Sequence, residues 1–331
     1  MSPHDRPARG AELSATERAI LDIIQCGFPL AADPYAEIGA QVGCTGEDAQ
    51  AITQALRQRG LIRRLGGSFD SRRLGYHSVL VAARVAPEQL EAVAVAVGDY
   101  PEVTHNYQRD HDYNLWFTVI AETPERLQQI LDDLRARPGV LALHGLPAVR
   151  TFKIRVDFAF DKPRNGGPAS VPPDDTPLVL DAVDRRLITR LCGDLDASRH
   201  PFASLAAEIG IPDDDLLARV RAYRSHGLLR RFGAILRHQQ AGMTANGMSV
   251  WRVPAAAVER IGACLAAQPE VSHCYERPPL PDWSYNLYAM IHARSEEECR
   301  QVAHRLAAET GIDDYTLLFS LREFKKTSMV Y

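Results

Sequence analysis

The N-terminal part of the chain carries apolar residues at the spacing of short α-helices. Ser14 is a suitable N-cap, and Glu17 completes a capping box with it, so the first helix is expected to begin there. A second helix is expected near 35–42 and a third, after the turn at Gly43, from about 46 to about 59. The residues expected to face inward are Ile20, Leu21, Ile24, Ala49, Ile52, Ala55 and Leu56. This succession predicts a helix-turn-helix.

Further along, the pattern changes to strand-like runs that alternate with two amphipathic helices. The expected strands are 78–85, 103–107 and 115–121, with an extended stretch at 140–152, and the expected helices are 88–97 and 124–135. The resulting order, βαββαβ, is that of a ferredoxin-like sandwich.

The second half of the chain repeats the first at an offset of about 167 to about 172 residues. The clearest matches are 61–66 with 228–233, 101–107 with 269–275, 113–115 with 285–287, and 150–153 with 322–325. We therefore expect an α+β fold, a tandem repeat of a winged helix-turn-helix and a ferredoxin-like domain, in which the two copies form an internal pseudo-dimer. The expected domains are 12–66 and 74–160, a linker rich in Pro, Gly and Asp at 161–177, then 178–233 and 241–331.

Composition favours a globular protein of the cytoplasm. Of the 331 residues, 46% are hydrophobic, which is enough to bury cores, but no stretch approaches the roughly 20 apolar residues that span a bilayer. The first ten residues are polar and lack the apolar core of a signal peptide. The six cysteines are scattered without a Cys-x-x-Cys pair, so neither a zinc module nor a disulfide framework is expected.

Charge argues against nucleic acid as a partner. The formal net charge is -4, and the third helix of the second copy opens with three carboxylates, at 213–215. In the first copy the same helix opens with Glu47 and Asp48, and its polar positions Gln50, Thr53 and Gln54 carry no positive charge. We interpret the helix-turn-helix modules as packing or dimerisation domains.

One strand of the first copy gathers groups suited to proton transfer and carboxylate binding. Alternation along a strand places His105, Tyr107 and Arg109 on one face, and Tyr113 begins the adjoining strand. The alternative is that the tyrosines are packing aromatics and His105 an ordinary histidine. The second copy keeps the polar types, which favours a ligand, while inserting a proline-rich stretch at 278–281. The retained residues are His273, Tyr275, Arg277, Tyr285 and Asn286.

Two arginine pairs, Arg63 with Arg64 and Arg230 with Arg231, stand where each helical module meets its sandwich. They are expected either to line a cleft between the domains or to be ordinary solvated arginines.

The segments 62–66, 105–109 and 113–117, with their counterparts in the second copy, resemble the sirohaem decarboxylases over nearly the whole chain. That family is similar in architecture to the Lrp/AsnC regulators. Its members usually pair two different subunits, and the fused form is similar to the protein of the haem d1 pathway. The resemblance implies conversion of sirohaem to 12,18-didecarboxysirohaem with release of two carbon dioxide molecules, and it implies no added cofactor and no metal of the protein's own.

For the chemistry, the resemblance suggests that His105, with Tyr113 or Tyr107 alongside, supplies and returns a proton while Arg109 holds the leaving acetate. Alternatively His105 or His273 ligates the substrate iron. The expected substrate-binding residues are Arg63, Arg64, Asn114, Trp116, Arg230, Arg231, His273, Arg277, Tyr285 and Asn286.

The second copy departs from the first in the proline-rich insertion and at two positions, where Cys274 replaces Asn106 and Tyr288 replaces Trp116. These departures indicate one competent site and one supporting half. The alternative functions are an Lrp-type regulator that senses haem or another small ligand and a haem-binding scaffold, and a homo-oligomer of the whole chain is a further expectation.

Overall fold

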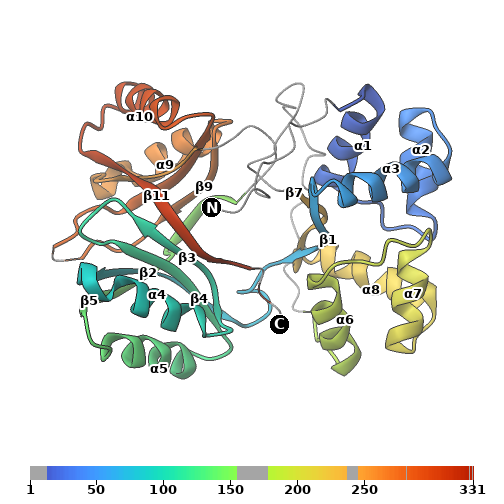
Figure 1. Ribbon diagram of the computed structural model, residues 1–331, viewed down its shortest axis with the longest axis horizontal. Helices are drawn as coiled ribbons and strands as arrows, with labels where there is room; N and C mark the ends of the chain where they lie inside the picture. The colour runs from blue at the N-terminus through green and yellow to red at the C-terminus, as the bar shows by residue number, and fades with distance from the viewer. Residues whose placement is uncertain (1–12, 155–177, 237–244, 281, 328, 330) are drawn as a thin grey trace, which may run out of the picture. The chain divides into compact units, whose positions relative to one another are not determined.

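The computed structural model describes residues 13–154, 178–236, 245–280, 282–327, 329 and 331, so the expected linker at 161–177 lies outside the described residues. The chain divides into two units, each built from both copies of the repeat (Figure 1). Of the described residues, one unit comprises 13–69, 178–236 and Tyr331, and the other comprises 70–154, 245–280, 282–327 and 329. Among the described residues, no helix is both long and apolar enough to cross a membrane.

The first unit contains the two helix-turn-helix modules. Their elements are α1 (Ala15–Cys26), α2 (Pro34–Val42), α3 (Gly46–Gln58) and β1 (Ile62–Phe69), then α6 (Ala182–Cys192), α7 (Pro201–Ile209), α8 (Asp213–Ser225) and β7 (Leu229–Leu236). Strands β1 and β7 pair antiparallel with Gly66 opposite Gly233, so the wings of the two modules form one small sheet.

The capping box at α1 is confirmed, because the Ser14 hydroxyl accepts from the Glu17 amide at 3.1 Å and the Glu17 carboxylate accepts from the Ser14 amide at 2.7 Å. The inner face of α3 was partly mispredicted. Ala55 is exposed and Thr53 is buried, since the buried face passes through every fourth or third residue from Ala49. The Thr53 hydroxyl donates to the Ala49 carbonyl at 2.8 Å and is thereby satisfied within the helix.

The polar face of α3 is occupied by the other helical module. Gln50 and Gln54 both donate through Nε2 to the Ala197 carbonyl, at 2.8 and 2.9 Å, and Arg57 donates to the Leu195 carbonyl at 3.1 Å. The polar positions that a recognition helix presents to DNA bases are here committed to contacts between the two copies.

The second unit contains the two ferredoxin-like domains, each in the predicted βαββαβ order. The first comprises β2 (His77–Val85), α4 (Leu90–Gly98), β3 (Val103–Arg109), β4 (Leu115–Ala121), α5 (Pro124–Arg135), β5 (Val140–Pro147) and β6 (Arg150–Ile154). The second comprises β8 (Ala245–Trp251), α9 (Val258–Ala267), β9 (Val271–Glu276), β10 (Leu287–Ala293), α10 (Glu296–Thr310) and β11 (Tyr315–Lys326). The stretch expected to be extended over 140–152 is two strands, β5 and β6.

The two domains exchange the ends of their last strands. The sheet order is β5-β2-β4-β3-β11-β8-β10-β9-β6, and β11 pairs with β8 through 315–319 and then with β3 of the first copy through 320–326. In return, β6 pairs with β9 of the second copy. In Figure 1 the long red strand β11 runs alongside β3.

This exchange explains why the motifs at 150–153 and 322–325 are repeated. Lys325 Nζ donates at 2.8 Å to the carbonyls of Gly98 and Tyr100, at the end of α4 in the first copy. Lys153 Nζ donates at 2.7 Å to the Gln268 carbonyl, at the end of α9 in the second copy. Each lysine therefore caps a helix of the opposite copy, where a cation is favourable.

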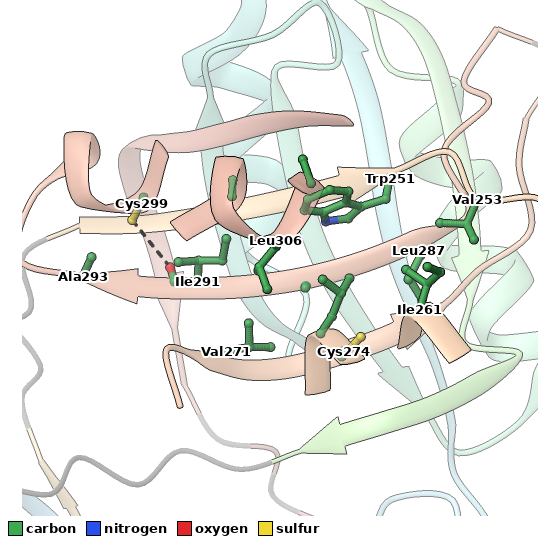
Figure 2. Packing of buried hydrophobic residues seen from close by; sticks show 14 of the residues in the cluster. Trp251, Val253, Ile261, Val271, Cys274, Leu287, Ile291, Ala293, Cys299 and Leu306 are labelled. Carbon is green, nitrogen blue, oxygen red and sulfur yellow. Dashed lines mark hydrogen bonds between the residues drawn. The ribbon is translucent and has the colours of Figure 1, made fainter. Parts of the chain in front are cut away.

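In each ferredoxin-like domain the helices pack on one face of the strands, and the opposite face packs against the other copy. Figure 2 shows the helix-side core of the second copy, where Trp251, Ile291 and Leu306 pack together with Cys299 directed at the Ile291 carbonyl. A separate cluster joins the two copies and comprises Ala82, Tyr113, Trp116, Leu146, Met248, Val250, Trp283, Tyr288 and Leu318. The face that carries this shared cluster, called the inner face below, also carries the polar residues of interest.

Candidate functional site

His105, Tyr107 and Arg109 lie side by side on β3, as strand alternation predicts, and are called the first cluster. The ring centroids of His105 and Tyr107 are 6.2 Å apart with an interplanar angle of 28°, and the Arg109 guanidinium carbon lies 5.7 Å from the Tyr107 centroid. His105 Nδ1 lies 3.0 Å from the Thr104 hydroxyl. An imidazole, a phenol and a guanidinium are thus presented together.

Arg109 is a buried cation with few partners. Its side chain is 4% exposed, Nη1 donates to the Leu318 carbonyl at 2.7 Å, and Nε has no hydrogen-bond partner. Among the described residues, no carboxylate forms an ion pair with it. Burial lowers the pKa of Arg109 to about 10, so the guanidinium remains protonated at neutral pH.

The second copy repeats this geometry on β9 and the residue that follows it, and His273, Tyr275 and Arg277 are called the second cluster. The ring centroids of His273 and Tyr275 are 6.2 Å apart, and the Arg277 guanidinium carbon lies 4.9 Å from the Tyr275 centroid. Arg277 is 9% exposed, its Nε lacks a hydrogen-bond partner, and burial lowers its pKa to about 10.

Each cluster depends on the opposite copy. Arg109 of the first copy donates to Leu318 on β11, and Arg277 of the second copy donates to Leu146 on β5. These carbonyls occupy corresponding positions in the repeat. Pairing of the two copies therefore holds both guanidinium groups in place.

Tyr113 belongs to a different group of side chains from the one expected. Its hydroxyl donates to Asp282 Oδ2 at 2.8 Å, and its ring lies 5.6 Å from Trp283 and 5.9 Å from His144. Burial, followed by the hydrogen bond to Asp282, raises the pKa of Tyr113 to about 12. The sequence interpretation missed Asp282 and Trp283, whose only signal was their position directly after the proline-rich insertion.

Two of the aromatic residues that were expected to bind substrate, Trp116 and Tyr285, pack against Trp283. The Trp116 ring centroid is 5.5 Å from that of Trp283, and the Trp116 indole donates to the Tyr113 carbonyl at 2.7 Å. The Tyr285 ring centroid is 5.0 Å from that of Trp283. Trp283, which follows the insertion of the second copy, thus forms the aromatic centre of the inner face.

The two retained asparagines clamp the backbone. Asn114 donates to the Val85 carbonyl at 2.8 Å and accepts from the Val85 amide at 3.0 Å. Asn286 makes the same pair of bonds with Val253, at 2.8 and 2.9 Å. This role accounts for an asparagine in both copies without a ligand, so substrate binding by these two residues stays a prediction.

The inner member of each arginine pair holds a helix end. Arg64 donates to the carbonyls of Cys192 and Gly193, at the end of α6, and burial lowers its pKa. Arg231 donates at 3.1 Å to the Gln25 carbonyl near the end of α1. Arg63 and Arg230 are exposed. Whether any of the four binds substrate stays a prediction.

Two family models match the chain, each of them twice. The model described as AsnC-like ligand binding domain matches residues 73–153 and 240–325. The model described as Siroheme decarboxylase NirDL-like HTH domain matches residues 17–63 and 184–230. The chain belongs to the sirohaem decarboxylase family. The predicted tandem repeat and both domain types are thereby confirmed.

Similar proteins include both fused and separate forms of the family. The siroheme decarboxylase of Hydrogenobacter thermophilus is 36% identical over 94% of this chain and 93% of its own. The siroheme decarboxylase beta subunit of Methanosarcina barkeri is 43% identical over 45% of this chain and 99% of its own, so one such subunit corresponds to one copy of the repeat. The crystal structure of the siroheme decarboxylase NirDL in co-complex with iron-uroporphyrin III analogue has a TM-score of 0.73 and 31% identity, covering 96% of this chain and 94% of that one.

Proposed function

We propose that this chain is a sirohaem decarboxylase, which removes carbon dioxide from the acetate side chains at ring positions 12 and 18 to give 12,18-didecarboxysirohaem. The observation that carries the proposal is the pair of buried arginines, Arg109 and Arg277, which form no ion pair among the described residues. A buried charge without a counter-ion is costly, and a substrate rich in acetate and propionate carboxylates provides that counter-ion on binding.

The reaction replaces a carboxylate by a proton. The conjugated macrocycle accepts the electron pair released when the carbon–carboxylate bond breaks, carbon dioxide leaves, and a proton from the protein completes the new methyl group. The neighbouring arginine orients the leaving carboxylate, and the imidazole beside it donates the proton. Because the macrocycle itself accepts the electrons, the proposal includes no added cofactor.

Both clusters carry the groups that this chemistry needs, so His105 and His273 are tested side by side. Replacing the proton-donating histidine by Ala is expected to abolish turnover while sparing substrate binding. A histidine that instead ligates the substrate iron would alter the absorption spectrum of the bound substrate when replaced, with turnover retained.

A DNA-binding regulator is the weaker reading of the fold. In the first copy, Gln50 and Gln54 of α3 are bonded to the other module. In the second copy, α8 opens with three acidic residues at 213–215, which repel phosphate. These features favour a packing role for the helical modules.

The test is incubation of the purified protein with sirohaem in the absence of oxygen, followed by chromatography and mass spectrometry. Two successive losses of the mass of carbon dioxide are expected. Arg109→Gln and Arg277→Gln should weaken binding or turnover, whereas Arg305→Gln, on the exposed side of α10, should not. Tight binding of sirohaem without any loss of mass would refute the decarboxylase assignment.

We place this activity in the cytoplasm and expect one fused chain to do the work of two separate subunits. Size measurement of the active protein by light scattering tests whether a homo-oligomer forms in addition.

A further inference from the structure

A hydrogen-bonded row of side chains extends from the second cluster across the inner face. His273 Nδ1 lies 2.8 Å from the Ser272 hydroxyl, and the same hydroxyl lies 2.7 Å from His292 Nε2 on the neighbouring strand β10. Ser272 is buried, and both histidines are half-buried. One hydroxyl thus joins two imidazoles.

The irregularity of β9 makes this row continuous. A register shift interrupts the pairing of β9 with β10 between Met290 and Ile291, and Ser272 falls within it. Adjacent residues Ser272 and His273 can therefore lie on the same side of the sheet, which strict alternation forbids.

The first copy lacks the end of this row. Thr104 occupies the place of Ser272, and its hydroxyl is 3.0 Å from His105 Nδ1. The place of His292 is taken by Ile120, because Ile120 pairs with Ser78 in the register in which His292 pairs with Asn246. The two halves carry the same clusters, but among the described residues the hydroxyl next to the histidine contacts a second imidazole only in the second copy, where His292 replaces Ile120.

A second polar group borders His292. Asn246, its partner on β8, points to the same face as Met248 and Val250, and its Oδ1 is buried without a hydrogen-bond partner. The second copy thus places an amide and an imidazole, Asn246 and His292, where the first copy has a hydroxyl and an isoleucine, Ser78 and Ile120.

We propose that the second cluster delivers the proton to the substrate, and that His292 reprotonates His273 through the Ser272 hydroxyl. This inference rests on the proposed decarboxylase function and names the half of the chain that performs its proton step. His292 acts through Ser272 and His273 and is a positioning and relay residue, whereas His273 is the proton donor.

The proton transfers balance as a chain of exchanges. The Nε2 proton of the His292 imidazolium moves to Ser272, the Ser272 hydroxyl proton moves to His273 Nδ1, and the His273 Nε2 proton moves to the substrate carbon that has lost carbon dioxide. His292 is left neutral and regains a proton from water, and His273 returns to its starting tautomer by proton exchange. One proton from water is consumed for each carbon dioxide released.

The test compares single-turnover rates of the full-length protein with sirohaem, without oxygen, for His292→Ile and His292→Gln. Ile120 shows that isoleucine is accepted at the corresponding position, and glutamine keeps a hydrogen-bond donor for Ser272 but cannot carry a proton. Both variants should bind sirohaem normally and lose about a hundredfold in rate, at the low end of what a positioned proton donor contributes. The exposed His304 on α10 supplies the matched control, His304→Gln, which should retain the wild-type rate.

Rates measured in mixtures of light and heavy water provide a readout that a structural role would not move. Several protons in flight give the wild type a curved dependence on deuterium fraction, which should become linear in both His292 variants. Full activity of His292→Gln, or an unchanged curve, would overturn the relay. Failure of the wild type itself to release carbon dioxide would instead refute the decarboxylase function, so the two failures are distinguishable.

Discussion

Replacing Arg109 by methionine should make the protein more stable while impairing its activity. Methionine fills a similar volume without charge, and Arg109 is 4% exposed with no carboxylate bonded to it among the described residues. A residue that costs stability in the free protein is expected at a site organised for an anionic ligand.

The magnitude follows from the pKa and from the bonds that are lost. Burial lowers the pKa of Arg109 to about 10, and at about 1.4 kcal/mol per pKa unit the charged side chain costs about 3 kcal/mol. The variant also loses the hydrogen bond to the Leu318 carbonyl, which offsets about 1 to about 2 kcal/mol of that gain. The free energy of unfolding of Arg109→Met should therefore rise by about 1 to about 2 kcal/mol. The folded-state pKa is lowered for a base, so the whole penalty is present below pH 10 and is relieved only as the pH rises above 10. The gain should therefore be independent of pH near neutrality.

Urea unfolding, followed by tryptophan fluorescence, measures the free energy of unfolding of the ferredoxin-like domains, which contain Arg109. The three tryptophans of the chain, Trp116, Trp251 and Trp283, all lie in the unit of the ferredoxin-like domains and are buried. Arg300→Met is the control, because that side chain is exposed on α10 and its ion pair with Glu296 should contribute less than about 1 kcal/mol.

A clear loss of stability in Arg109→Met would mean that the contacts of the guanidinium outweigh its desolvation. The inference that the buried Arg109 guanidinium binds a substrate carboxylate would then be wrong. Saturating sirohaem should stabilise the wild type more than the variant, which tests the same reasoning from the ligand side.

Three further outcomes are expected. Lys325→Met should lower the free energy of unfolding by about 1 kcal/mol in the same fluorescence assay, because the end of α4 loses its cap. The Tyr113 hydroxyl holds the pKa of Asp282 below its ordinary value. The stability from this hydrogen bond is therefore fully present when the pH is above the ordinary pKa of an aspartate, and it is lost as the pH falls through the lowered pKa. Tyr113→Phe should accordingly weaken the acid dependence of the urea midpoint. Replacing Gln50 and Gln54 together by Ala should destabilise the helical unit by about 1 to about 2 kcal/mol by circular dichroism, and should create no DNA binding in a mobility-shift assay.

The elements of this fold were predictable because their signals are local. Strand β4 and helix α5 have the bounds that periodicity predicts, 115–121 and 124–135. The error at Ala55 has a local cause as well, since a threonine can satisfy its own hydroxyl within the helix and so replace an alanine on the buried face.

The exchange of strand ends was not predictable from the same patterns. Arg109 and Leu318 are far apart in the sequence, and no periodicity relates them, so the contact that buries the guanidinium appears only once the copies are paired. Asn114 illustrates a second limit. Its recurrence in both copies suggested a ligand, but a clamp on the Val85 backbone produces the same recurrence.

Fusion gives this chain a freedom that an assembly of identical subunits lacks. Both halves need the other's carbonyl to hold an arginine, at Leu318 and at Leu146, which explains why the two clusters retain the same residues. On the strand next to each cluster the halves differ, with His292 in the second copy and Ile120 in the first. If both halves bind one polyanionic substrate, both must keep the residues that bind it. If a single half supplies the protons, the residues next to the histidine are free to differ between the halves, as His292 and Ile120 do.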